Sequence, residues 1–424
     1  MDKVITYIQA FFKPENYTLK NLVYVTIVLM CIQYIPLESR GGVSPIKVAL
    51  MAIMPFVLMT HFIPNKAFFL GILYLIWIFF VAAGLYPASF RASTVLYTGM
   101  FVITFVVVYT AVWNYEVFEL EEFRTFMIRF FYVLVVVLLI QQFFILIGIK
   151  YFPLINLCQI LNRGIGANSL TFEPSTLGRV LAIFYYVILK LTEYSQGEKV
   201  NLKQAFQGDL KWITIGYAWC VVTMGSGTAF LAAGITVLYF MKGWGFLTAI
   251  PIFVAVFFIL ESSGNESFRR AQAASLATMT GDAEIVRQTD GSASQRIAPM
   301  LNTLHADFTS TDFWIGKGTD STDWWDFVQG RGYLGHINDY GLISYILELF
   351  IVFGCCIRFR SLATIYFFTG TGGGITNISY GWGILMVFCC LKYFYYHSYE
   401  QEEKNIEKQE REILNINNTI HESN

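Results

Sequence analysis

Residues 93–113 read STVLYTGMFVITFVVVYTAVW and contain no Asp, Glu, Lys or Arg. A stretch of about 20 apolar residues is long enough to cross the hydrocarbon core of a bilayer as one helix. Runs of similar character recur along the chain, near 19–37, 44–63, 67–86, 93–113, 128–149, 174–191, 212–225, 227–241, 244–260, 338–357, 360–371 and 376–396. The sequence therefore predicts an all-α polytopic membrane protein with about 12 transmembrane helices.

The composition of the 424-residue chain supports this class. Hydrophobic residues make up 55% of the sequence and charged residues only 14%, whereas soluble domains carry about 25% charged residues. The net charge is -1 and no basic stripe is present, so a nucleic-acid partner is not expected, while membrane lipid is. The seven cysteines form no CxxC pair, which favours small buried side chains over a zinc or redox site.

The basic residues of the short loops predict the orientation. The segment 192–211 carries Lys199, Lys203 and Lys211, and loops rich in Lys and Arg face the cytoplasm. Both termini are then cytoplasmic, and the polar stretch 261–337 lies on the outer side. The predicted organisation is a first part of the helical bundle, an outer loop or cap, a last part of the bundle and a cytoplasmic tail, at 1–260, 261–337, 338–397 and 398–424.

A histidine stands where the outer loop returns to the membrane. Residues 332–342 read GYLGHINDYGL, with His336 just before an apolar run. Asn338 or Asp339 could cap the helix that starts here, and either could orient the imidazole. Since the pKa of histidine is near neutrality, His336 is suited to proton transfer. The alternative is an interfacial histidine without a chemical role.

Arginines of the outer side are candidates for binding an anion. Arg296 lies in GSASQRIAPM (291–300), where Ser292 or Ser294 could cap a short helix. An arginine near a helix N-terminus suits a phosphate group, because its planar fork adds to the partial positive charge of the helix end. The alternative is a solvated loop arginine.

A further arginine is predicted within the bilayer boundary. Glu173 precedes Pro174, which suits the first turn of a helix, and Arg179 follows in that helix. An ionisable residue at such depth marks a functional site by default; here it faces an anionic ligand or forms a structural pair with Glu173. Nearby candidates are Arg163 and the small-residue turn around Ser226, where helices or a ligand can approach closely.

The order of these motifs resembles the O-antigen polymerase and O-antigen ligase superfamily of bacterial inner-membrane glycosyltransferases. The resemblance extends over nearly the whole chain as a layout of many helices with a long periplasmic loop before the last few. The residues that carry it are Phe172-Glu173-Pro174-Ser175 with Gly178-Arg179, the Gly-Ser-Gly-Thr turn at 225–228, Ser294-Gln295-Arg296, Ile315-Gly316-Lys317-Gly318, and His336-Ile337-Asn338 with Gly341-Leu342. Members often have a Ser-Arg pair at the turn, whereas this chain has Ser226-Gly227-Thr228.

The resemblance implies a GT-C-like fold in the bacterial inner membrane, with no cofactor and no metal. It implies a polymerase that transfers glycan from undecaprenyl diphosphate to a sugar hydroxyl of another lipid-linked unit, at the periplasmic face. Donor and acceptor are both undecaprenyl-diphosphate-linked oligosaccharides, and a chain-length regulator and a flippase are candidate protein partners. The expected roles are catalysis by His336, Glu173 and Arg296, diphosphate binding by Arg179, Arg163 and Arg296, and support by Asn338, Asp339 and Ser226.

Two alternatives remain open at this point. A ligase of the same superfamily would transfer the finished glycan to lipid A core. A polysaccharide flippase or other transporter would be expected to carry ionisable residues near the bilayer midplane and to need no long outer loop. The sequence shows almost no such charge within a predicted span before Lys392 and has the long segment 261–337, which counts against transport.

Overall fold

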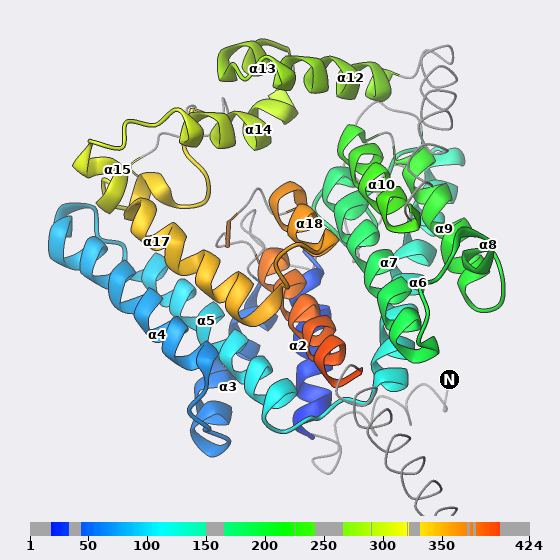
Figure 1. Ribbon diagram of the computed structural model, residues 1–424, viewed down its shortest axis with the longest axis horizontal. Helices are drawn as coiled ribbons and strands as arrows, with labels where there is room; N and C mark the ends of the chain where they lie inside the picture. Colours follow the sequence, from blue (N-terminus) through cyan, green and yellow to red (C-terminus); the bar gives the residue numbers. More distant parts are fainter. Residues whose placement is uncertain are drawn as a thin grey trace, which may run out of the picture.

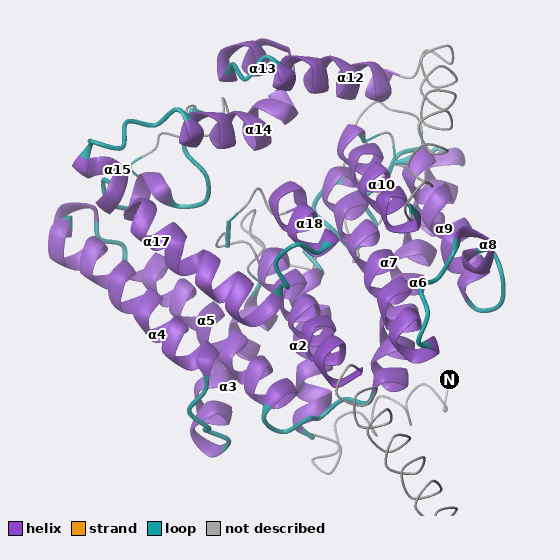
Figure 2. Cartoon of the chain, viewed as in Figure 1, coloured by secondary structure: helices purple, strands orange, loops and turns teal. Residues whose placement is uncertain are grey.

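A computed structural model describes most of the chain, at residues 18–33, 44–149, 165–224, 226–241, 266–289, 291–319, 321, 331–370, 374–375 and 379–398. These described residues form helices and contain no β-strand (Figure 2). Five helices are long and apolar enough to cross a membrane: α4 with its π-helical continuation η2 (Lys66–Leu85), α5 (Ala92–Trp113), α6 (Leu120–Leu146), α7 (Pro174–Gln196) and α17 with η4 (Ile337–Cys356). This architecture agrees with the prediction of an all-α membrane protein.

Shorter apolar helices occupy most of the other predicted runs. They are α2 (Leu19–Cys31), α3 (Pro45–Thr60), α9 (Leu210–Thr223), α10 (Gly227–Phe240), α18 (Leu362–Gly370) and a helix over 379–398. The predicted run 244–260 lies outside the described residues. The nine residues of α18 span only about 14 Å, less than a bilayer core of about 30 Å. The number of twelve spans therefore stays a prediction.

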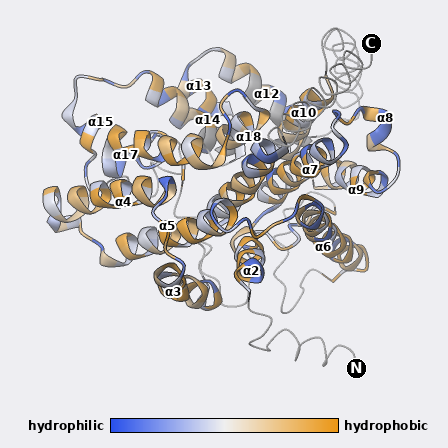
Figure 3. Cartoon of the chain, turned by 60° about the horizontal axis from the view of Figure 1, so that its bottom comes forward, coloured by the Kyte–Doolittle hydropathy of each residue, from blue (hydrophilic) through white to orange (hydrophobic). Residues whose placement is uncertain are grey.

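The apolar surface of the bundle suits contact with lipid. Large side chains such as Phe56, Met59, Phe69 and Ile76 are exposed on α3 and α4. Figure 3 shows hydrophobic residues along α3, α4, α5 and α6, whereas the region of the short helix α8 (Leu202–Ala205) is hydrophilic. Exposed apolar helix faces on this scale are expected where the surrounding solvent is a bilayer.

Two groups of helices form the bundle (Figure 1). One contains α3, α4, α5 and α17; the other contains α6, α7, α9 and α10. The helix over 379–398 packs on the first group, because Trp382 is buried and stacks on the ring of Phe101. Close approach in the second group depends on Gly178 of α7, where an added Cβ would stand 2.5 Å from the Cβ of Ala229 on α10.

The described residues from 266 to 315 form short helices outside the bundle. They are α12 (Glu266–Met279), α13 (Ala283–Thr289), α14 (Gly291–Leu304) and α15 (Thr311–Ile315). Helix α12 contacts α10 and α15 contacts α17, so this segment lies across one end of the bundle and joins both groups (Figure 1). We call this the His336 end, where α7, α10 and α17 begin, and the opposite end the Lys392 end.

Candidate functional site

A break in α17 determines the position of His336. Gly341 has φ +78° and non-helical dihedral angles within the first turns of α17. The preceding residues fold back beside the helix, since a Cβ on Gly335 would lie 3.1 Å from the Tyr345 ring and 3.2 Å from Oε2 of Glu348. The break therefore brings His336, at the helix N-cap position, next to the following turns of the same helix.

The His336 imidazole has one carboxylate neighbour and one unused nitrogen. Its Nδ1 lies 3.6 Å from Oδ2 of Asp339, and the side chain is 19% exposed. Its Nε2 is buried and has no hydrogen-bond partner among the described residues. An imidazole oriented at one nitrogen by a carboxylate, with the other nitrogen unoccupied, is the arrangement required of a general base.

The surroundings of His336 stabilise its protonated form. Burial alone would lower the pKa of His336, but the bond to Asp339 and the negative charges of Glu348 and Asp339 outweigh it, so the pKa is raised. A raised pKa strengthens the neutral imidazole as a proton acceptor.

Glu348 is a buried carboxylate that the sequence analysis did not identify. It is 1% exposed, and Oε1 accepts a hydrogen bond from the Tyr74 hydroxyl at 3.1 Å. Oε2 accepts from the backbone N–H of Ile375 at 3.3 Å. The available signal was a glutamate inside the apolar sequence YILELFI (345–351), because ionisable residues within membrane helices are rare and mostly functional.

Helix α15 holds the His336 turn through backbone contacts. The N–H groups of Lys317 and Gly318 donate to the carbonyls of Asn338 and Asp339 at 2.8 and 3.0 Å. A Cβ on Gly341 would lie 2.1 Å from the carbonyl oxygen of Trp314, so only glycine fits there. The motif at 315–318 and the histidine motif, far apart in the sequence, thus form one structural unit.

Arg179 is buried at the start of α7, as predicted from its depth. It is 7% exposed, and Nη1 donates to the carbonyl of Gly370 at 2.6 Å. Nη2 donates to Oγ1 of Thr176 at 3.2 Å, and Nε donates to the carbonyl of Ser175 at 3.2 Å. The described residues place no carboxylate within ion-pair distance of Arg179, so the predicted pair with Glu173 does not form. Three of the five N–H donors have acceptors among the described residues, and the other two have none there.

A second buried cation at this end is Lys47, which the sequence analysis also missed. It is 0% exposed, and Nζ donates to Oγ of Ser379 at 2.8 Å. The neighbouring Tyr380 lies under the Arg179 guanidinium, 5.5 Å from its ring centroid. Lys47 stands at the beginning of an apolar run, and only the packing of α3 on the helix over 379–398 reveals its burial.

One short segment connects these groups. Gly370 accepts from Arg179, and Gly374 packs on Gly335, because a Cβ on Gly374 would lie 2.6 Å from the Cα of Gly335. The same segment continues to Ile375, which bonds Glu348, and to Ser379, which bonds Lys47. The described parts of 370–380 thus contact Arg179 and Lys47 as well as the turn of His336.

The other predicted residues have different outcomes. Ser226 is buried beside Thr228, whose hydroxyl reaches the carbonyl of Ser175 at 3.5 Å, so the turn before α10 lies at the start of α7. Glu173 is the N-cap residue of α7 without a side-chain cap and bonds the Ser175 hydroxyl. Arg163 and the side chain of Arg296 lie outside the described residues.

Three expectations need correction. Asn338 and Asp339 are not caps: α17 begins at Ile337 with His336 as N-cap, and Asp339 Oδ1 instead accepts from Ser321 at 3.1 Å. Helix α14 begins at Gly291, so Ser292 and Ser294 lie inside it and do not cap a helix that starts near Arg296. The scarcity of charge within the spans is also wrong, since Glu348 is buried in α17.

Comparison with known proteins adds no relative: no family model, no curated protein and no solved structure matches this chain.

Proposed function

We propose that the protein is a glycosyltransferase that polymerises lipid-linked oligosaccharide repeat units at the periplasmic face of the bacterial inner membrane. The observation that carries the proposal is His336, whose Nδ1 faces Asp339 and whose buried Nε2 has no partner among the described residues. The resemblance of the ordered motifs to O-antigen polymerases and ligases supports the same reading.

In the proposed reaction, His336 Nε2 accepts the proton of the acceptor sugar hydroxyl. The hydroxyl oxygen forms a bond to the anomeric carbon of the donor glycan, and the bond from that carbon to the diphosphate breaks. Asp339 orients the imidazole and stabilises its charged form. The electrons of the broken bond leave with undecaprenyl diphosphate, so no oxidant or reductant is needed.

The leaving diphosphate requires positive charge. Two N–H donors of Arg179 have no acceptor among the described residues. Lys47 is buried and bonds Ser379, the neighbour of the Tyr380 that lies under Arg179. Buried cations that are positioned before the reaction stabilise developing negative charge more strongly than solvated ones. We infer that Arg179 and Lys47, together with Arg296 of α14 or Arg163, bind the diphosphate.

The test compares two histidines of the same outer segment in cells that lack the chromosomal copy. His336→Ala should reduce long-chain glycan by about 100-fold or more, because general-base catalysis contributes about 10²–10⁴-fold. His305→Ala is the matched control, since His305 is exposed at the end of α14 and its Nδ1 contacts the Leu301 carbonyl. Immunoblots should show equal membrane insertion of both variants. Normal polymer with His336→Ala would refute the assignment.

A ligase is the second candidate, since the same site would serve it. The lipid-linked species that accumulate on deletion distinguish the two: a single repeat unit on its carrier indicates a polymerase, and full-length glycan on its carrier indicates a ligase. A transporter is the third candidate. The observation in its favour is Glu348, a carboxylate buried within a membrane-spanning helix. Loss of polymer with His336→Ala while lipid-linked units still reach the periplasm would exclude transport.

A further inference from the structure

A cavity at the Lys392 end belongs to no part of the proposed reaction. It has a volume of about 320 Å³, at the lower end of the range for small-molecule sites. Its walls come from the ends of α7, α10 and η4, the start of α18 and the helix over 379–398. Arg179 and Lys190 lie on the same helix, about 16 Å apart along its axis, so this cavity is separate from the site at the His336 end.

The cavity is strongly cationic. Four basic side chains and a single carboxylate line it: Lys190, Lys199, Arg358, Lys392 and Glu193. The carboxylate is already engaged, because Oε1 of Glu193 accepts from Lys190 at 2.5 Å and Oε2 accepts from the Tyr239 hydroxyl at 2.8 Å. Among the residues that the structure describes, Arg358 and Lys392 have no ion-pair partner, so their charges are available to a ligand.

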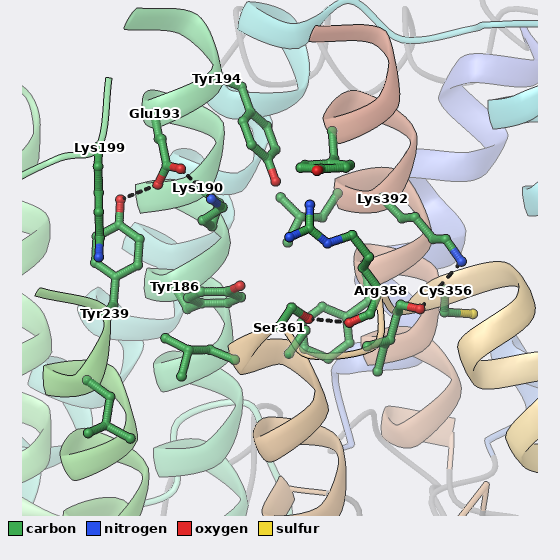
Figure 4. A pocket seen from close by; sticks show the side chains of 17 residues that line it. Tyr186, Lys190, Glu193, Tyr194, Lys199, Tyr239, Cys356, Arg358, Ser361 and Lys392 are labelled. Atoms are coloured by element: carbon green, nitrogen blue, oxygen red, sulfur yellow. Dashed lines mark hydrogen bonds and ion pairs between the residues drawn. The ribbon is translucent and has the colours of Figure 1, made fainter. Parts of the chain in front are cut away.

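Arg358 is the cation best placed to meet a ligand. Figure 4 shows its guanidinium reaching into the cavity, on the side of Tyr194 away from Lys190. It lies over the Tyr395 ring, 3.9 Å from the centroid, and has no ion-pair partner among the residues that the structure describes. The Arg358 side chain is exposed to solvent, so an anion that enters the cavity from water can reach it. Stacking on the Tyr395 ring fixes the position of its fork of N–H donors.

Lys392 adds a fixed positive charge to the wall. Its Nζ donates to the carbonyls of Phe353, Gly354 and Ile357 at 2.8, 2.9 and 3.4 Å. These bonds hold the ammonium beside the end of η4 without neutralising it. Tyrosine hydroxyls and the Ser361 hydroxyl complete a polar lining, while Leu362 and Phe388 supply apolar wall.

We propose that this cavity binds a phosphate group, either on a phospholipid head group or as a free anion. A dianionic phosphate matches the charges of Arg358 and Lys392, and the planar fork of Arg358 can hold two of its oxygens. Tyrosines around the site can donate to the remaining oxygens. The apolar part of the lining suits the glycerol region of a lipid.

The experiment uses the purified full-length chain in detergent, with thermal stability and calorimetry as readouts. The probes are inorganic phosphate and dioctanoyl phosphatidic acid, with zwitterionic dioctanoyl phosphatidylcholine for comparison. Inorganic phosphate, phosphatidic acid or both should bind. Arg358→Gln should raise the Kd of the probe that binds about tenfold or more, since a bond between charged groups contributes that much. The Kd of Arg358→Lys should fall between those of the unchanged protein and Arg358→Gln, because lysine keeps the charge but lacks the planar fork.

The matched control is Arg360→Gln. Arg360 is an exposed arginine like Arg358 and lies two residues further along the chain, but it does not line the cavity. Binding of the lipid alone would assign the site to a head group, and binding of phosphate alone would assign it to a soluble anion. Equal weakening by Arg358→Gln and Arg360→Gln would overturn the proposal, because general surface charge would then explain binding. Absence of binding by both probes would overturn it as well.

Discussion

The two ends of the bundle arrange their charged side chains in opposite ways. At the His336 end, acids and bases are mixed, and Asp339 and Glu348 surround one imidazole while Arg179 and Lys47 stand apart from them. At the Lys392 end, cations predominate and their one carboxylate is engaged. Mixed charges suit proton transfer, whereas charges of one sign suit the binding of an oppositely charged group. This difference in charge is the basis of the two proposals, a reaction at the His336 end and anion binding at the Lys392 end.

The sharpest test of this contrast removes a cation at the His336 end. Arg179→Gln should lower polymer formation about 100-fold, because a positioned donor to a developing anion contributes about 10²–10³-fold. The measurement is the length distribution of lipid-linked glycan. Arg360→Gln, at the Lys392 end, is the control and should leave polymer length unchanged. Equal effects would mean that charge at both ends acts only on insertion or folding.

A smaller effect should follow from disturbing the backbone at the His336 end. Gly341→Ala places a Cβ 2.1 Å from the Trp314 carbonyl oxygen at φ +78°, and should cost about 2 kcal/mol or more of stability. Thermal unfolding of the detergent-solubilised chain measures this. Gly99→Ala is the control, since nothing lies within 4 Å of an added Cβ in α5. A stable Gly341→Ala protein would show that α15 does not hold the turn.

The smallest expected effect is a shift in pH dependence. His336 must be neutral to accept a proton, so activity should be lost as pH falls through its raised pKa, above the ordinary value of about 6.5. Asp339→Asn removes a negative charge that favours the imidazolium, so the acid limb of kcat/KM should move to lower pH. Glu348→Gln should move it in the same direction. If the acid limb of kcat/KM did not move in either variant, the group that titrates in this limb would not be His336.

Much of the helical pattern was predictable because apolar runs long enough for a bilayer are unmistakable. The boundary at 227 is an example: the predicted run 227–241 corresponds to Gly227–Phe240, since small residues end one helix and begin the next. Arg179 was predicted to lie inside the bilayer boundary from its distance to Pro174, and it is buried in the protein. In both cases, local sequence carries the information.

The missed residues depend on contacts between distant segments. Lys47 is buried against a segment far along the chain, where Ser379, 332 residues away, accepts its hydrogen bond. The position of His336 beside Glu348 depends on the break at Gly341, which the sequence shows only as one glycine among 33. The expectation that Asn338 or Asp339 caps α17 was wrong for the same reason. The break moves the helix start to Ile337, and Asp339 turns toward Ser321 and His336.

The backbone contact between α15 and α17 has a mechanical consequence. Because Lys317 and Gly318 donate to carbonyls within the histidine turn, any displacement of the outer helices at this point is transmitted directly to His336. On the opposite side, α12 touches α10, whose first residues lie against the start of α7 and so near Arg179. The outer helices therefore contact both the turn of His336 and, through α10, the start of the helix that carries Arg179, so the two proposed parts of the site share one covering segment.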